Sequence, residues 1–167
     1  MKLNKSDSQH SSLVSAIARY GGRLKKIPYL PILIDEEIKI FTFFFRPRRF
    51  MKMQAIFNHA AIVLKLDTAY HRFGGIDFLW NKQEIAHLHS NGLLDIQYPR
   101  GLAEILISRG LAEPHHIYPA SGWTSLQVNG NTDTHIPIQL ILWSLLLHKK
   151  EITLEEVIEL IKNNSSV

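Results

Sequence analysis

Apolar residues recur at helical spacing in the first third of the chain. Two segments, 35–45 and 48–64, each carry an apolar face with a period near that of a helix, and Pro47 between them cannot continue one. Asp35 begins the first segment, where the helix dipole favours negative charge. An earlier stretch, 11–20, ends at two glycines and also predicts a short helix. The N-terminal third is therefore expected to be helical.

The pattern changes to a period of two in the middle of the chain. Aromatic and polar residues alternate there, which predicts strands. Asn81-Lys82 and Asn91-Gly92 are typical of tight turns, and such turns join antiparallel neighbours. In the third strand the alternation places Ile85, His87 and His89 on one face. The predicted strands cover residues 69–73, 76–80, 84–90, 93–98, 115–118 and 123–128.

Helical signals return towards the C-terminus. Proline at the start and glycine after the end bound a helix over 99–109, and a second, apolar helix is predicted over 132–148. A last helix begins at Thr153, and Glu156 three residues later completes a capping box. Strands clustered in the middle with helices around them indicate an α+β fold. We expect an antiparallel sheet of five to six strands flanked by helices, with an N-terminal helical extension.

Charge divides the chain after residue 52. Residues 1–52 contain eleven Lys or Arg and four Asp or Glu, whereas residues 53–167 contain eight and eleven. We therefore expect a basic helical extension over 1–52 and an α+β domain over 53–167. A domain that docks on phosphates carries its positive charge on the folded module, so the slightly acidic balance of 53–167 disfavours nucleic acid as a partner.

Composition excludes several classes of protein. Apolar residues make up 46% of the chain and charged residues 20%, which is typical of a globular domain. The chain has no cysteine, so disulfides, thiolate metal sites and a cysteine nucleophile are excluded. A cytoplasmic location is expected. No signal peptide is expected either, because residues 1–18 lack a continuous apolar core.

The segment 38–53 allows two interpretations. Its apolar run, 38–45, is too short to cross a bilayer, so no transmembrane segment is expected. Five phenylalanines nevertheless stand beside Arg46, Arg48 and Arg49, a composition also found in helices that lie on anionic membranes. The segment is expected either to pack its aromatic side on the domain with snorkelling arginines or to make a peripheral membrane contact.

Candidate chemistry concentrates between residues 71 and 125, where five of the nine histidines lie. Histidine is suited both to metal ligation and to proton transfer near neutral pH. The glycines and the tryptophan around these histidines are typical of a shaped site rather than a regular surface. The candidate ligand-binding residues are His71, Arg72, His87, His89, Arg100, His115, His116 and Trp123.

Three interpretations of the histidines are open. His87 and His89, two apart on a strand, project from one face, and with His115 and Asp95 they form a candidate site for a divalent metal. His71 or His116 is an alternative third imidazole, and Glu113 an alternative carboxylate. The second interpretation is packed histidines that hydrogen-bond to the backbone or to Asp95. The third is a pocket in which the histidines bind an anionic or aromatic small molecule beside Trp123.

Several motifs, in this order, resemble those of the luciferase-domain family of small bacterial and fungal proteins. The resemblance covers about residues 66–148, and Phe45–Pro47 is similar to part of an extension that some bacterial members carry. It implies a domain identity but no catalytic residues, and the (β/α)₈ barrel of bacterial flavin luciferases does not fit 167 residues with antiparallel hairpins. The motifs are His71–Gly75, His87–Gly92, Asp95 with Pro99-Arg100, Glu113–His116 with Pro119, and Ser121–Trp123 with Ser125.

The layout of strands and helices also resembles, more weakly, the MmcQ/YjbR-like or double-wing fold, which implies nucleic-acid binding. Three functions follow as hypotheses. The first is a small-ligand-binding or interaction domain with a histidine-rich pocket. The second is a metal-dependent enzyme, for example an oxidoreductase, that uses the histidines. The third, which the charge balance favours least, is a nucleic-acid-binding module in which Arg72 and Arg100 contact phosphates.

Overall fold

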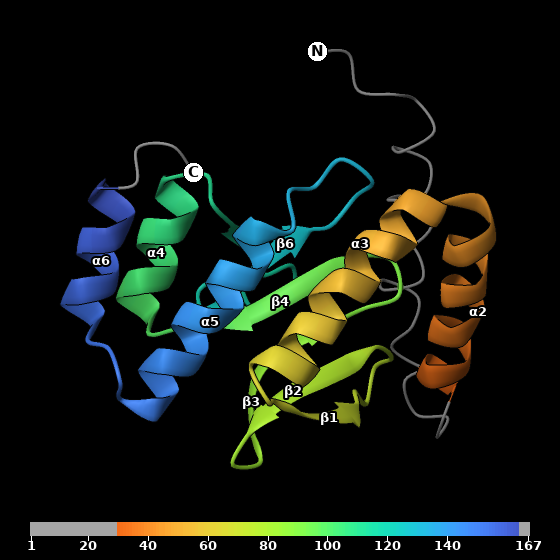
Figure 1. The fold of residues 1–167 in the computed structure, drawn as a ribbon, viewed down its shortest axis with the longest axis horizontal. Coiled ribbons are helices and arrows are strands. Elements are labelled where there is room, and N and C mark those ends of the chain that lie inside the picture. The colour runs from red at the N-terminus through yellow and green to blue at the C-terminus, as the bar shows by residue number, and fades with distance from the viewer. Residues whose placement is uncertain (1–29, 164–167) are drawn as a thin grey trace.

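The computed structural model describes residues 30–163 (Figure 1), so the helix predicted at 11–20 lies outside the described part. Six strands form one antiparallel sheet in the order β1-β2-β3-β4-β6-β5, which confirms the predicted α+β class. The strands are β1 Asp67–Tyr70, β2 Ile76–Trp80, β3 Gln83–Leu88, β4 Leu93–Gln97, β5 Glu113–Pro114 and β6 Trp123–Gln127. The helices are α2 Leu30–Phe45, α3 Pro47–Asn58, the π-helical turn η2 His59–Val63, α4 Arg100–Ser108, α5 His135–Lys149 and α6 Leu154–Asn163.

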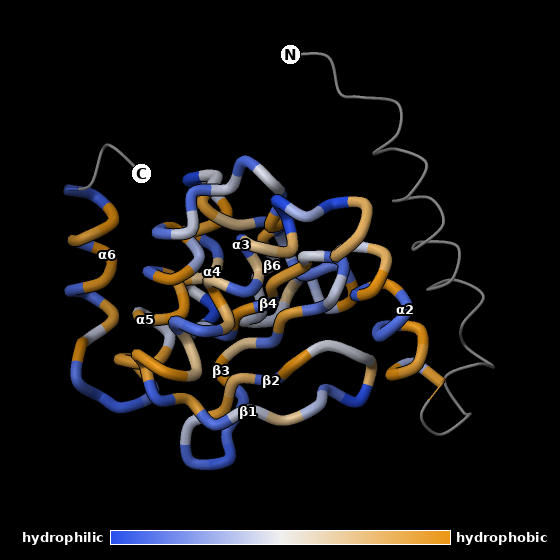
Figure 2. The backbone as a smooth tube through the Cα atoms, turned by 45° about the vertical axis from the view of Figure 1, so that its right-hand side comes forward, coloured by the Kyte–Doolittle hydropathy of each residue, from blue (hydrophilic) through white to orange (hydrophobic). Residues whose placement is uncertain are grey.

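One face of the sheet forms the hydrophobic core with the helices. Figure 1 shows α3 and α5 crossing this face. Phe78 of β2 is fully buried, and its ring centroid lies 6.1 Å from that of Phe57 in α3. Figure 2 shows hydrophobic segments within β3 and β4 and an alternation of hydrophobic and hydrophilic turns along α6. Because side chains alternate along a strand, the other face of the same strands carries the polar residues described below.

The two predicted tight turns are confirmed. Asn81 and Lys82 have φ values of 50° and 66°, the left-handed pair that a two-residue hairpin turn requires. Gly92 has a φ of 87°, and its N–H donates to the carbonyl oxygen of His89 (2.9 Å). The turns fix β2, β3 and β4 as consecutive antiparallel neighbours.

A β-bulge interrupts β3. Phe78 pairs with Ala86, but the next residue of β2, Leu79, pairs with Glu84, so Ile85 is an extra residue in β3. Ile85 is fully buried in the hydrophobic core. The prediction that it shares a face with the histidines is therefore wrong, because a strict period of two does not hold across a bulge.

Two predicted strands are also wrong in their position. The strand predicted at 69–73 is β1, which ends at Tyr70, and the chain then turns through Gly74 and Gly75 with φ values of 88° and 93°. The strand predicted at 115–118 is a turn instead. The imidazole of His115 accepts hydrogen bonds from the backbone of this turn and bends the chain away from the sheet.

Within residues 30–163, each predicted helix has a counterpart in the structure, but not every boundary agrees. α2 begins five residues before the predicted start, so Asp35 lies inside the helix rather than in its first turn. α3 ends at Asn58 and continues as η2 instead of extending to residue 64. The capping box is confirmed, since the Thr153 N–H donates to Glu156 Oε2 (2.8 Å) and the Glu156 N–H to Thr153 Oγ1 (3.2 Å). The division after residue 52 remains a prediction.

A helix that crosses a bilayer needs about 20 mostly apolar residues. Among the described helices, none combines the length and apolar character needed to cross a membrane, in agreement with the absence of a predicted transmembrane segment.

Candidate functional site

The register of the sheet lines up polar residues from neighbouring strands. Asp77 of β2 pairs with His87 of β3, His87 with Asp95 of β4, Asp95 with Ser125 of β6, and Ser125 with Glu113 of β5. Directly paired residues point to the same face, so these side chains form one row across the sheet. The row lies on the face opposite the hydrophobic core.

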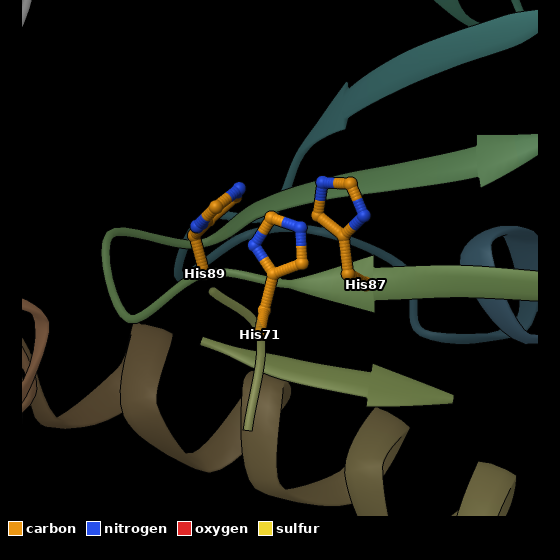
Figure 3. A group of neighbouring side chains, drawn as sticks. All are labelled: His71, His87 and His89. Carbon is orange, nitrogen blue, oxygen red and sulfur yellow. The ribbon is translucent and has the colours of Figure 1, made fainter. Parts of the chain in front are cut away.

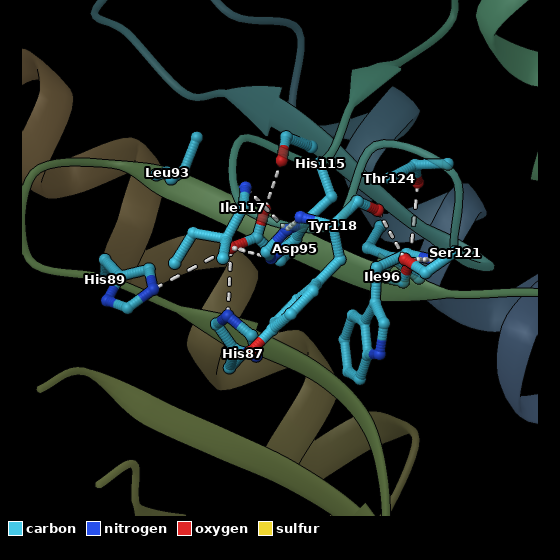
Figure 4. A network of polar contacts seen from close by, with 12 residues as sticks. His87, His89, Leu93, Asp95, Ile96, His115, Ile117, Tyr118, Ser121 and Thr124 are labelled. Atoms are coloured by element: carbon cyan, nitrogen blue, oxygen red, sulfur yellow. Dashed lines mark hydrogen bonds and ion pairs between the residues drawn. The ribbon is translucent and has the colours of Figure 1, made fainter. Parts of the chain in front are cut away.

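Asp95 is the centre of the row and is completely buried. Its Oδ2 accepts a hydrogen bond from His87 Nε2 (2.9 Å), and its Oδ1 accepts one from Ser125 Oγ. The Nε2 atoms of His89 and His115 lie 3.8 Å and 3.7 Å from the same Oδ2 (Figure 4). Three imidazoles thus converge on one carboxylate oxygen.

His87 is held between two carboxylates. Its Nε2 bonds to Asp95 and its Nδ1 to Glu84 Oε1 (2.6 Å). In a regular strand, residues three apart lie on opposite faces. The bulge at Ile85 brings Glu84 and His87 to the same face. Because both ring nitrogens face acceptors, both donate and the ring carries a positive charge.

The neighbouring rings cover His87. The His71 ring stacks on it with centroids 4.3 Å apart and planes 10° apart, whereas His89 meets it edge to face at 4.9 Å (Figure 3). The ring centroid of Trp123 lies 5.3 Å from that of His87. His71 stands on the Gly74–Gly75 turn, which packs tightly, since a Cβ on Gly75 would come within 2.5 Å of the Leu88 carbonyl oxygen. Ring stacking on a cation is favourable, so these rings stabilise the charged His87.

His115 has a defined tautomer. Its Nδ1 accepts the backbone N–H groups of Ile117 (3.1 Å) and Tyr118 (3.0 Å), so in the neutral ring the proton is on Nε2, which faces Asp95. The Tyr118 ring stacks on His115 with centroids 5.6 Å apart. The loop that replaces the predicted strand thereby supplies one of the donors around Asp95.

The pKa values separate the cluster into charged and neutral members. Burial lowers the pKa of His87, but the hydrogen bonds to Asp95 and Glu84 outweigh it and raise that pKa to about 9. Burial and the positive charge of His87 lower the pKa of His89 to about 4 and also lower that of His71. For Asp95, burial raises the pKa, yet the hydrogen bonds from His87 and Ser125 leave it below its ordinary value. Near neutral pH a charged His87 therefore lies among neutral imidazoles.

Asp77 is the remaining carboxylate of the row. Burial and the neighbouring Glu84 raise its pKa to about 6. Its Oδ1 and the Nδ1 of His71 are buried without a hydrogen-bond partner among the described residues. Both residues belong to a group with Glu84 and His87 whose ligand atoms lie within 4.8 Å of one another.

The sequence predicted much of this cluster. The structure brings together His71, His87, His89, His115, Asp95 and Trp123. His116 is exposed but stacks on His115 (4.6 Å), and Arg72 is exposed with its guanidinium 4.5 Å from the Phe73 ring centroid. Arg100 pairs with Glu104 along α4 (3.9 Å), and Glu113 is exposed at the sheet edge.

Sequence reasoning missed three members of the cluster. Glu84 was missed because only the bulge brings it to His87. Ser125 and Asp77 were not proposed as site residues because their place depends on strand order, although Ser125 belongs to the motif that begins at Ser121. The signal available in the sequence was a polar residue at a strand position that could face the histidines of a neighbouring strand.

α2 contacts the loops that carry this cluster. Asp35 Oδ1 accepts the Ser90 N–H (3.1 Å), its Oδ2 accepts the Ser90 hydroxyl (2.6 Å), and the Thr42 hydroxyl donates to the Ser90 carbonyl oxygen (3.1 Å). Burial raises the pKa of Asp35, although the Ser90 hydrogen bonds oppose it. Ser90 follows His89 directly, so α2 helps to position that imidazole.

Comparison with known proteins identifies the segment that contains most of the site. Residues 82–143 match the family model described as Luciferase domain. The match extends from the turn before β3 into α5 and includes His87, His89, Asp95, His115 and Ser125, with His71 just outside it. No curated protein and no solved structure matches the chain. The resemblance to the luciferase-domain family that the motifs predicted is thus confirmed over residues 82–143.

Proposed function

We propose that this domain binds a small planar organic molecule with a weakly acidic group at the histidine cluster and exchanges a proton with it. The observation that carries the proposal is the convergence of three imidazole Nε2 atoms on Asp95 Oδ2, at 2.9, 3.7 and 3.8 Å. A buried cluster of ionisable groups costs stability, and clusters of this kind with opposed pKa shifts are concentrated at functional sites.

The members of the cluster suit different roles. The His89 side chain is 16% exposed, and its lowered pKa keeps it neutral near neutral pH, so its ring can accept a proton. The negative charge left on the ligand would lie beside this ring and raise its pKa, so that it keeps the proton it takes. The proton that it accepts would lie beside the Asp95 carboxylate. His87, which stays charged, would stabilise the anion that the ligand becomes.

A continuous series of rings supports a planar ligand. Neighbouring centroids are separated by 4.3 to 6.3 Å, and the rings at the two ends, Phe73 and Tyr118, are 40% and 57% exposed. Aromatic surface beside a few convergent polar groups is typical of small-molecule sites. The guanidinium of Arg72, over Phe73, adds positive charge at one end. The series is Phe73, His71, His87, Trp123, His115 and Tyr118.

The experiment uses para-nitrophenol as the probe, because its absorbance reports its own ionisation. The wild-type protein should bind it and increase the fraction of phenolate near neutral pH. His89→Gln should keep binding within a few-fold but lose the change in ionisation. His135→Gln, an exposed histidine at the start of α5, is the matched control and should behave as wild type.

Two results would contradict the proposal. The first is no binding of para-nitrophenol or of the related planar carboxylate para-nitrobenzoate at millimolar concentrations. The second is an equal change in ionisation for the wild type and His89→Gln, which would mean that His89 exchanges no proton with the ligand.

A divalent metal is the second candidate for the same cluster. The unpartnered His71 Nδ1 and Asp77 Oδ1, grouped with Glu84 and His87, favour it. The ring geometry disfavours it, because a metal lies in the plane of each imidazole that binds it, whereas the His71 and His87 rings are nearly parallel and stacked. His87 and both Asp95 oxygens already have hydrogen-bond partners, which leaves His89 and the Nε2 of His115 of the predicted metal set.

Elemental analysis of protein purified without an affinity tag separates the two candidates. Stoichiometric zinc, iron, copper or manganese that is lost in His71→Ala and Asp77→Asn but kept in His135→Gln would establish the metal site. A nucleic-acid role has no comparable support. Arg72 lies over the Phe73 ring, Arg100 pairs with Glu104, and the matched segment 82–143 has no excess of basic residues.

A further inference from the structure

α2 buries two polar side chains against the domain and exposes most of the apolar residues of its second half. Its buried residues are Asp35 and Thr42, which bond to Ser90. Figure 1 shows α2 at one edge of the molecule, on the side away from α4 and α6. A helix of a globular protein ordinarily buries its apolar stripe, so this orientation requires another explanation. The exposed apolar residues of α2 include Leu33 (62%), Ile40 (58%), Phe43 (51%), Phe44 (69%) and Phe45 (72%).

The aromatic residues gather where α2 meets α3, a region we call the elbow (residues 40–52). The Phe43 ring lies 5.1 Å from Phe44 and 5.1 Å from Phe50 in edge-to-face contacts, which link the two helices. Met51, on α3, is 68% exposed. Large exposed apolar side chains that adjoin one another mark interaction surfaces.

Positive charge surrounds the aromatic residues of the elbow. The sequence contains six Lys or Arg and no Asp or Glu between Ile38 and Leu66. A shallow cavity of about 370 Å³ lies beside the aromatic residues and is lined by Phe45, Arg46, Pro47, Arg48, Arg49 and Gly130. The elbow therefore combines exposed apolar area with a basic rim.

We propose that the elbow docks on an anionic membrane surface, with Phe44 and Phe45 inserted at the level of the headgroups and with Arg48 and Lys52 against lipid phosphates. This inference is independent of the proposed ligand site. Insertion of aromatic side chains together with attraction of basic residues is the binding mode of peripheral amphipathic helices. A second copy of this chain fits less well, because a two-fold contact through the elbow would bring Arg48 and Lys52 of both copies together.

Flotation of the full chain with vesicles tests the proposal. Binding to vesicles of phosphatidylcholine with phosphatidylserine should exceed binding to phosphatidylcholine alone, and salt should weaken it. Phe44→Ser combined with Phe45→Ser should reduce the partition coefficient by about 100-fold, since each Phe loses burial that corresponds to roughly a factor of ten or more. Arg48→Glu should reduce it by about tenfold through charge reversal.

Matched controls keep the test specific. Leu160→Ser removes an exposed apolar side chain on α6, and Arg109→Glu reverses an exposed charge after α4; both should float as wild type. Equal binding of wild type and the double Phe variant would overturn the proposal, as would no flotation of wild type with either vesicle. Concentration-dependent dimers that the double Phe variant abolishes, without vesicle binding, would also overturn it and assign the surface to a second copy.

Discussion

The charged state of His87 predicts a specific loss of stability in alkaline solution. Its pKa of about 9 in the folded protein compares with an ordinary value of 6.5. A group whose pKa is raised by folding stabilises the protein fully below its unfolded pKa, and this contribution disappears as the pH rises through its folded pKa. The stability in question should therefore be present at pH 6 and be lost between pH 7 and pH 10.

The magnitude follows from the two pKa values. At pH 7 a shift from 6.5 to about 9 corresponds to roughly 2–3 kcal/mol of unfolding free energy, and at pH 10 to nearly none. For a chain of this length such a loss lowers Tm by roughly 5–10 °C. The groups that lie against His87 and titrate near or below pH 6, Asp77 and His89, do not contribute in this alkaline interval.

Urea unfolding of wild type, His87→Gln and the control His135→Gln at pH 7 and pH 10 measures the effect. Wild type and His135→Gln should each lose roughly 2–3 kcal/mol more unfolding free energy than His87→Gln between pH 7 and pH 10. An NMR titration of the imidazole gives the pKa directly. If His87→Gln lost as much stability as wild type, or if the ring titrated near 6.5, the assignment of a charged His87 between two carboxylates would be refuted.

Three further predictions concern the support of the site. Gly75→Ala should lower stability by about 2 kcal/mol or more, measured by thermal unfolding, because its positive φ disfavours a side chain and the new Cβ meets the Leu88 carbonyl oxygen; unchanged Tm would contradict the tight turn. Asp35→Ala should cost about 1–3 kcal/mol in chemical unfolding by leaving the Ser90 donors without their acceptor, and unaltered stability would show that α2 docks otherwise. His89→Gln should reduce the loss of stability between pH 6.5 and pH 4, since the unfolded imidazole takes up a proton before the folded one; identical acid profiles would count against a neutral His89.

Local sequence determined most of the elements. Turn residues such as Asn81-Lys82 and Asn91-Gly92 need left-handed backbone conformations, so they locate hairpins without any tertiary information. The capping box at Thr153 and Glu156 likewise depends only on neighbours in the chain. The period of two along a strand is also local, and it correctly predicted that His87 and His89 share a face and belong to one cluster.

The predicted strand and helix boundaries were wrong where tertiary contacts override the local sequence pattern. A period-two pattern continues through His71 and His115, yet glycine turns and a side-chain cap end the strands there. The bulge at Ile85 depends on the pairing of β2 with β3, and the sequence carries no signal for it. The start of α2 was placed too late because acidic residues were assigned to a first turn, whereas Asp35 is buried against Ser90.

The sequence by itself determined a resemblance to the luciferase domain, an antiparallel sheet, a histidine-rich segment and a basic aromatic segment at 38–53. Only the tertiary structure decided that Asp95 is the centre of the cluster, because strand order and register place His87 and Ser125 on either side of it. It also decided that the bulge brings Glu84 to His87, which converts an ordinary histidine into a buried cation. Protonation depends on which charges lie within a few ångströms of a ring, and that distance is a property of the fold rather than of the residue order.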